Sequence, residues 1–181
     1  MCNSFNKKFL DEANKIMNDG TDNLENVHKH FMDEAIKIAI NGVNKNEGGP
    51  FGCVVVLDGK IIGKGNNRVT TKNDPTAHAE MEAIRAACKT LKSFQLEACT
   101  IYTSCEPCPM CLGAIYWARP AKVYYGCNKK DAAELGFDDH FIYKEMNLPN
   151  KNKSISLEQI SKEDALKPFQ IWKEKEDKIE Y

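Results

Sequence analysis

The chain has 181 residues, the size of one globular domain that can bury a full hydrophobic core. Hydrophobic residues make up 42% and charged residues 28%, a composition that argues against wholesale disorder. The 25 Lys and Arg residues face 26 Asp and Glu residues, and the resulting net charge of −1 lacks the electrostatic signature of a nucleic-acid or anionic-membrane binder.

Neither a membrane span nor a secretory signal is visible in the sequence. The longest apolar stretch, residues 110–118, has nine residues, whereas a helix needs about 20 to cross a bilayer. The first eight residues lack the apolar centre of a signal peptide. We therefore expect a cytoplasmic protein that does not associate with a membrane.

The N-terminal part of the chain divides into a polar extension and the start of a folded domain. Residues 1–23 form the extension, and the domain is expected to span residues 24–181. Apolar residues recur at helical spacing from Val27 to Ala39, with Gly42 near the expected end, and this pattern predicts a helix.

Beyond this helix the sequence predicts a hairpin and then alternating strands and helices. The hairpin is indicated by Asp58-Gly59, a strong tight-turn signal between two apolar runs. Strands are expected at residues 53–57, 60–63, 99–103, 122–126 and 155–160. The later helices are expected near residues 78–91, 107–118, 139–145 and 169–178. This order predicts an α/β protein, a three-layer α/β/α sandwich around a central mixed sheet of five strands.

Cysteine is the informative residue type in the composition. The chain has eight cysteines, about 4%, which is below the 8–10% typical of short disulfide scaffolds. A reducing compartment also disfavours a disulfide framework. Three of the cysteines, Cys105, Cys108 and Cys111, fall within seven residues. Some of these thiols are therefore expected to do chemistry, whereas the others pack.

The strongest motif joins His78-Ala79-Glu80 to Pro107-Cys108-Pro109-Met110-Cys111. The two thiolates can converge on one ion across the first turn of a helix, and His78 supplies a third ligand. Three protein ligands leave the fourth position of a zinc ion open to a water or hydroxide, which is the catalytic pattern. Glu80 would then move protons without binding the metal. This pattern is a signature of zinc-dependent nucleobase deaminases.

Two other interpretations of the C-x-x-C pair stay open at this point. It is also found in redox pairs and as half of a structural zinc site, which needs a fourth thiol or imidazole. Cys105 is the near candidate, but a strand-to-helix bend places it awkwardly. A zinc-stabilised interaction module, the non-enzymatic alternative, would leave Glu80 without a role. The remaining cysteines are interpreted as packing or surface thiols: Cys2, Cys53, Cys88, Cys99 and Cys127.

From about Val27 to its C terminus, the chain resembles the bacterial guanine deaminases of the cytidine deaminase-like superfamily. The matching segments are residues 48–52, 70–80, 103–120, 131–134, 136–139 and 180–181. The zinc motif alone is shared with cytosine, cytidine, nucleotide and tRNA-adenosine deaminases, so it indicates the reaction class and not the substrate. The segment Gly136-Phe137-Asp138-Asp139 and the terminal Tyr181 are more discriminating.

The resemblance implies hydrolysis of guanine to xanthine and ammonia in purine catabolism or salvage. Glu80 and Asp139 would be catalytic, and zinc would be held by His78, Cys108 and Cys111. The implied partners are a small purine base, not nucleic acid, and a second copy with which the C-terminal segment is exchanged. The resemblance also implies a set of substrate contacts: Phe51, Asn67, the backbone N–H of Ala79, Asp139 and Tyr181.

The same contact residues have simpler interpretations when each is taken alone. Phe51 beside a strand is typical of a core residue, and Asn67 is typical of a polar strand end. Asp139 would be a helix-capping or solvated acid. Tyr181 is at a chain end, where order is usually low.

Overall fold

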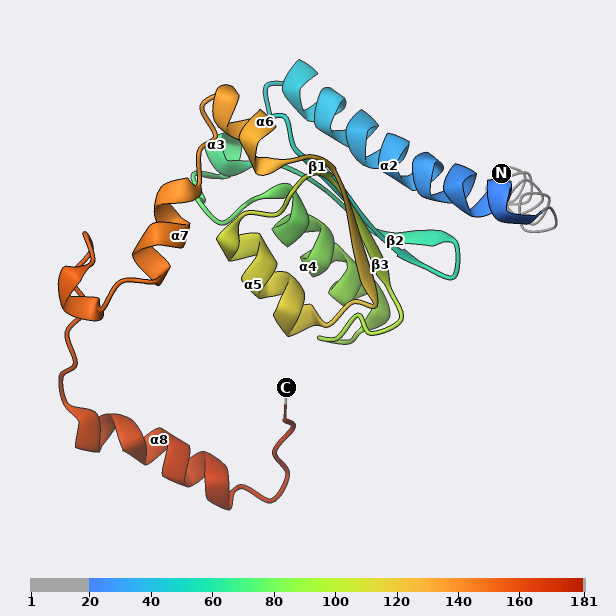
Figure 1. Ribbon diagram of the computed structural model, residues 1–181. Coiled ribbons are helices and arrows are strands. Elements are labelled where there is room, and N and C mark those ends of the chain that lie inside the picture. The colour runs from blue at the N-terminus through green and yellow to red at the C-terminus, as the bar shows by residue number, and fades with distance from the viewer. Residues whose placement is uncertain (1–19, 181) are drawn as a thin grey trace. The chain divides into compact units, whose positions relative to one another are not determined.

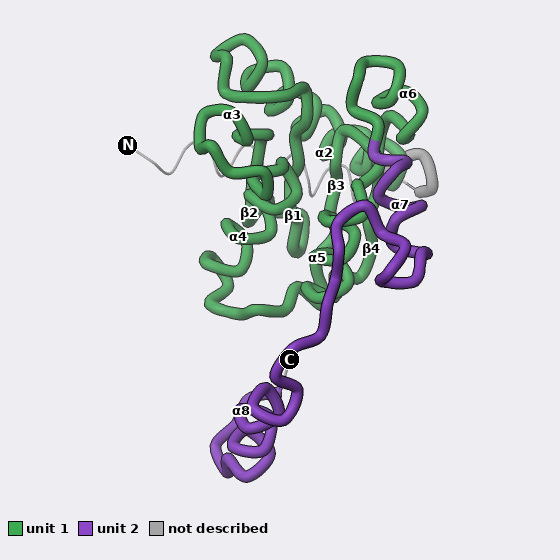
Figure 2. Tube along the Cα trace, turned by 90° about the vertical axis from the view of Figure 1, so that its left-hand side faces the viewer, with its two compact units in different colours: residues 1–138 green, residues 139–181 purple. Residues whose placement is uncertain are grey.

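The structure, a computed structural model, describes the backbone of residues 20–180 and the side chains from residue 24 onward (Figure 1). The first 19 residues of the expected extension and Tyr181 lie outside the described residues. The chain divides into two compact units, the first ending at Asp138 and the second beginning at Asp139 (Figure 2). The two units are described separately below.

The first unit is built on a mixed sheet of four strands in the order β2-β1-β3-β4. The strands are β1 (Gly52–Leu57), β2 (Lys60–Asn66), β3 (Thr100–Cys105) and β4 (Lys122–Cys127). Strand β1 is antiparallel to both β2 and β3, whereas β3 and β4 are parallel. The expected turn joins β1 to β2, with positive φ at Asp58 (48°) and Gly59 (71°), as a tight hairpin turn requires.

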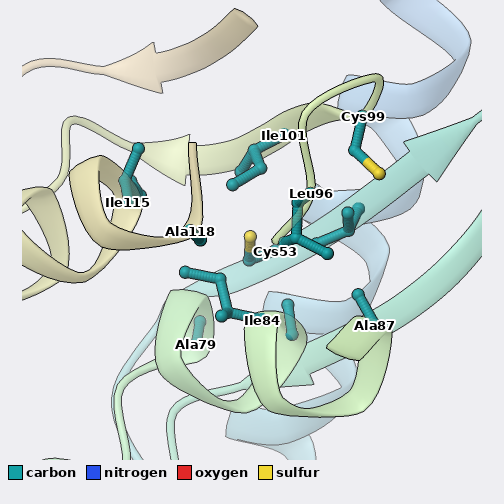
Figure 3. Packing of buried hydrophobic residues seen from close by; sticks show 11 residues of the cluster. Cys53, Ala79, Ile84, Ala87, Leu96, Cys99, Ile101, Ile115 and Ala118 are labelled. Atoms are coloured by element: carbon teal, nitrogen blue, oxygen red, sulfur yellow. The ribbon is translucent and has the colours of Figure 1, made fainter. Parts of the chain in front are cut away.

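Helices cover both faces of this sheet because successive strand residues point to opposite sides (Figure 1). On one face, Val54 and Tyr102 pack with Phe31 and other residues of α2 (Gly20–Asn44). On the other face, Val55 and Ile101 pack with α4 (Ala79–Leu91) and α5 (Pro109–Ala118). Figure 3 shows this second cluster, in which Ile84, Ile115 and Ala118 surround the sheet residues.

Further helices complete the two units. In the first unit these are α3 (Val69–Lys72) and α6 (Lys129–Glu134), and α6 begins with a capping box formed by Asn128 and Asp131. The second unit consists of α7 (His140–Met146), the 3₁₀ turn η1 (Asn150–Asn152) and α8 (Lys162–Glu174). Within the described part of the chain, no helix combines the length and apolar character needed to cross a membrane.

The mixed α/β architecture agrees with the sequence prediction, but the number of strands does not. The prediction of five strands is wrong, because residues 155–160 form neither strand nor helix. Ile155 and Ile160 are 77% and 80% exposed, and the second unit contains no strand among its described residues with which this segment could pair. An alternating apolar pattern needs a neighbouring strand before its backbone groups can form a ladder.

The last helix also differs from the prediction of residues 169–178. Helix α8 begins at Lys162 and ends at Glu174, and Pro168 lies inside it. Glu163 and Asp164 occupy its first turn, where negative charge interacts favourably with the helix dipole. This acidic first turn explains why the helix begins several residues before the predicted start.

Glycines on β2 bring α4 unusually close to the sheet. A Cβ added at Gly65 would lie 2.2 Å from the carbonyl oxygen of Ala79, and one added at Gly63 would lie 2.4 Å from that of Ala83. Both distances are below van der Waals contact, so a side chain at either position would displace the helix backbone. Because α4 begins directly after His78, these glycines help to determine where that residue lies.

Replacement of Gly65 by Ala should therefore lower the free energy of unfolding by about 1–3 kcal/mol, the usual cost of overpacking. Urea denaturation of the zinc-loaded protein measures this change. Gly113→Ala in α5 is the matched control, since an added Cβ meets no atom within 4 Å there. In a helix interior this control should be neutral or stabilising by about 0.5–1 kcal/mol. Equal stabilities of the two variants would contradict the packing argument.

Candidate metal centre and active site

The N-terminal ends of α4 and α5 bring three metal-ligating side chains together. His78 is the N-cap residue of α4, and Cys108 is the N-cap residue of α5, with Cys111 one turn further along. The ring nitrogen Nδ1 of His78 lies 3.5 Å from the Sγ atom of Cys108 and 3.5 Å from that of Cys111. Zn–N and Zn–S bonds of ordinary length at a tetrahedral angle would separate such atoms by about 3.6 Å. The donor set therefore fits zinc in both type and spacing.

The local sequence explains why α5 can present two sulfur atoms in this way. Pro109 occupies the first position of the helix, where its missing N–H removes no hydrogen bond and its fixed φ suits helical geometry. The unpaired backbone N–H groups at the start of a helix also stabilise negative charge on sulfur. Cys108 is half-buried and Cys111 is buried, so the thiol pair is partly shielded from water.

Hydrogen bonding within the cluster polarises the two thiols. The interaction with the thiol of Cys111 is the main cause that lowers the pKa of Cys108 to about 4, and His78 lowers it further. The same interaction raises the pKa of Cys111. The bond to Cys108 also raises the pKa of His78. All three groups offer lone pairs once they are deprotonated, so a bound divalent cation would displace their protons.

A buried carboxylate lies beside the metal-ligating cluster. Glu80 is only 6% exposed, and its Oε2 atom lies 3.5 Å from the Sγ atom of Cys111. Burial is the main cause that raises the pKa of Glu80 above its usual value. A carboxyl group with a raised pKa, placed next to a metal site, is suited to accept and return protons.

Thr103 is a residue of the site that sequence reasoning did not identify. It is 1% exposed on β3, and its hydroxyl donates a hydrogen bond of 3.3 Å to Oε1 of Glu80. The hydroxyl therefore helps to orient the carboxyl group. The sequence signal for this role was weak. Thr103 is a polar residue among mainly apolar buried residues of β3, but β-branched residues such as threonine are common in strands.

The loop before α4 is held by a small hydrogen-bond network. The Oδ1 atom of Asp74 accepts hydrogen bonds from the backbone N–H of Thr76 at 2.8 Å and from its hydroxyl at 2.7 Å. These bonds lower the pKa of Asp74. The backbone N–H of Arg68 donates to the carbonyl of Ala77 at 2.9 Å, which ties the loop to the end of β2. The position of His78 therefore follows from a structured loop.

The expected substrate contacts Asn67 and Phe51 are adjacent in the structure. The backbone N–H of Asn67 donates to the carbonyl oxygen of Phe51 at 3.0 Å. The Oδ1 atom of Asn67 accepts from the backbone N–H groups of Gly49 (3.1 Å) and Val69 (3.3 Å). Because the oxygen is engaged in this way, the amide NH₂ is the group that Asn67 can direct to a ligand. The sequence suggested that Asn67 could both donate to a ligand and accept from it, whereas the structure leaves it the role of donor.

Phe51 packs as a residue beside a strand is expected to, and its contact with a purine stays a prediction. It is half-buried and packs against the core cluster of α4 and α5. Its ring also meets that of Phe137 edge-to-face, with centroids 4.9 Å apart and planes at 86°. Phe137 belongs to the Gly-Phe-Asp-Asp segment and is 45% exposed. The two rings therefore bring the loop before β1 and the segment after α6 into contact.

The three remaining expected site residues, Ala79, Asp139 and Tyr181, lie in separate parts of the chain. Ala79 is buried at the first position of α4, where backbone N–H groups have no partner within the helix. Asp139 belongs to the second unit and precedes α7, where its side chain forms no capping hydrogen bond. Tyr181 lies outside the described residues.

Cys105 is not part of the metal-ligating group of described residues, which consists of His78, Cys108 and Cys111. Burial is the main cause that raises the pKa of Cys105 to about 11, and Cys127 is the second. That Cys105 does not bind the metal stays a prediction, which the zinc content of a Cys105→Ala variant tests.

Comparison with known proteins gives the family. Residues 25–127 match the model of the cytidine and deoxycytidylate deaminase zinc-binding region. The guanine deaminase of Bacillus subtilis (strain 168) is 58% identical over 143 residues, which cover 79% of this chain and 92% of the relative. The chain belongs to the guanine deaminase family.

Solved structures and more distant relatives agree with this family assignment. The X-ray structure of guanine deaminase from Bacillus subtilis matches with a TM-score of 0.83 and 56% identity, over 85% of this chain and 98% of the other. The tRNA-specific adenosine deaminase of Agrobacterium fabrum (strain C58) is 45% identical over 89 residues, 48% of this chain and 59% of the relative. The guanine deaminase match thus extends well beyond the segment shared with the tRNA enzyme.

The metal site predicts a specific pattern of zinc binding. Purified protein should hold one zinc ion per chain, and both Cys108→Ala and Cys111→Ala should lose it, because each removes one of three protein ligands. Atomic absorption measures the zinc content. Cys105→Ala is the matched control and should keep its zinc. Zinc retention in Cys108→Ala, or zinc loss in Cys105→Ala, would show that the ligand set is different.

Proposed function

We propose that the protein hydrolyses guanine to xanthine and ammonia. The observation that carries this proposal is the buried Glu80 beside His78, Cys108 and Cys111, in a chain that aligns with 92% of a guanine deaminase. The balanced charge of the chain supports a small neutral base over tRNA, whose phosphates call for an excess of Lys and Arg.

Zinc and Glu80 would share the chemistry. His78, Cys108 and Cys111 would hold the ion and leave its fourth position to water, where zinc lowers the pKa of water to about 7. Glu80 would carry protons from the attacking water to the base, first to the ring nitrogen beside the amino-bearing carbon and then to the departing amine. Thr103, which donates to Oε1, would keep the carboxyl group aimed during both transfers.

The remaining expected residues would bind and orient the purine. The amide NH₂ of Asn67 would donate to an acceptor on the purine edge, and the backbone N–H of Ala79 would contact the base carbonyl. Phe51 would pack one face of its ring on the base. Asp139 would bind the ring nitrogens and assist proton transfer, and Tyr181 would close the site. The family resemblance supports these last two roles.

A panel of substrates tests the proposed function. Zinc-loaded protein should release ammonia from guanine, and not at a comparable rate from adenine, cytosine, cytidine or a substrate tRNA. Glu80→Gln is the control: it should keep zinc and fold, and lose turnover by about 10²–10⁴-fold, the usual contribution of general acid–base catalysis. No ammonia from guanine, or undiminished turnover in Glu80→Gln, would overturn the proposal.

We also propose that the protein forms a homodimer with exchanged C-terminal segments. Helix α5 exposes apolar side chains beside the metal ligands, with Tyr116 at 75% and Trp117 at 64% exposure. Helix α8 of the second unit also exposes apolar side chains, with Phe169 at 70% and Ile171 at 69% exposure. Apolar surfaces of this kind mark interaction sites, and a two-fold dimer would cover both.

Complementation between two inactive variants tests the exchange. If segments are exchanged, co-expression of Glu80→Gln with Asp139→Asn creates dimers in which one site has both native residues. Random pairing should then restore about a quarter of the wild-type activity per chain. Light scattering of the mixture confirms the dimer mass. Activity no higher than that of either variant alone, or an active monomer, would contradict the exchange.

A further inference from the structure

Two cysteines that the metal site does not use lie side by side at the ends of neighbouring strands. Strand β3 ends at Cys105 and β4 ends at Cys127, and these residues are Cα partners in the parallel register. Neighbouring strands lie about 4.7–4.9 Å apart, and register partners project toward the same face. Disulfide-bonded cysteines have Cα atoms about 4.4–6.8 Å apart. The backbone therefore already holds the pair at a bonding separation.

The two thiols differ in their access to solvent. Both are free, but Cys105 is only 7% exposed whereas Cys127 is exposed. Both also line an apolar cavity of about 520 Å³, whose wall includes Leu135 and Phe137. The exposed thiol can meet an oxidant in solution, and the neighbouring thiol can then resolve the mixed disulfide.

Hydrogen bonds connect this pair to the loop that carries the metal ligand Cys108. The backbone N–H of Glu106 donates to the carbonyl of Cys127 at 2.8 Å, and the carboxylate of Glu106 accepts from the backbone N–H of Lys129 at 3.1 Å. The thiol of Cys105 lies 3.8 Å from the carbonyl oxygen of Asn128. A covalent bond between Cys105 and Cys127 would therefore constrain the start of the loop that leads to Cys108.

We propose that Cys105 and Cys127 form a reversible disulfide with a low-molecular-weight disulfide as oxidant. The Cys127 thiolate attacks the oxidant, forms a mixed disulfide and releases one thiol. The Cys105 thiol then loses its proton and attacks the sulfur of Cys127, which releases the second thiol. Two protein thiols are oxidised to one disulfide, and one small disulfide is reduced to two thiols. Cys108 and Cys111 stay on the metal.

Mass spectrometry of the zinc-loaded protein after incubation with oxidised glutathione tests this proposal. Trypsin without reduction should release residues 93–122 joined to residues 123–129, because cleavage does not occur between Arg119 and Pro120. The joined peptide should have lost two hydrogen atoms, and fragment ions should place the bond at Cys105. Dithiothreitol should reverse the bond, and the zinc content should stay at one per chain.

Two variants complete the experiment. Cys127→Ser removes an exposed thiol, so it should fold and show no cross-link, with Cys105 left reduced. Cys88→Ser, which removes a half-buried thiol of α4, is the matched control and should cross-link as the wild type does. A bond to Cys108 or Cys111 with loss of zinc would overturn the proposal. Glutathione that remains on Cys127 while Cys105 stays reduced would also overturn it.

Discussion

The structure depends on the meeting of two helix N termini above the same sheet. This arrangement places the imidazole of His78 3.5 Å from the thiols of Cys108 and Cys111, and the carboxyl group of Glu80 3.5 Å from the thiol of Cys111. The two thiols and the carboxyl group repel one another when all three are ionised, and burial makes this repulsion stronger. A divalent cation relieves the repulsion, so the cluster is suited electrostatically to a metal ion.

Close packing of the surrounding fold maintains this arrangement. Gly63 and Gly65 let α4 approach β2, which determines the height of His78 and Glu80 above the sheet. The parallel pair β3 and β4 needs a crossover connection, and α5 supplies it while carrying both thiols. The same elements therefore build the core and present the ligands.

The opposite face of the sheet is held by a different kind of contact. His28 of α2 lies 2.8 Å through Nδ1 from the hydroxyl of Tyr102 and 3.0 Å through Nε2 from that of Tyr124. The two tyrosine rings stack with centroids 5.2 Å apart, and burial is the main cause that raises the pKa of Tyr102 to about 12. This polar network binds α2 to β3 and β4, the strands that lead into the metal-ligand loop and into α6.

The sequence by itself indicated the candidate metal-ligating group, the alternation of strands with helices and the reaction class, because these depend on residue type and short spacing. His78, Cys108 and Cys111 could be grouped from their motif before any fold was known. Beyond the hairpin, tertiary structure decided which strands pair, and residues 155–160 failed to form a fifth strand because their unit offers no described strand as partner. It also decided that Thr103 reaches Glu80, and that the oxygen of Asn67 is engaged by Gly49 and Val69. The contacts of Thr103 with Glu80 and of Asn67 with Gly49 join residues far apart in the chain, and spacing along the sequence carries no information about them.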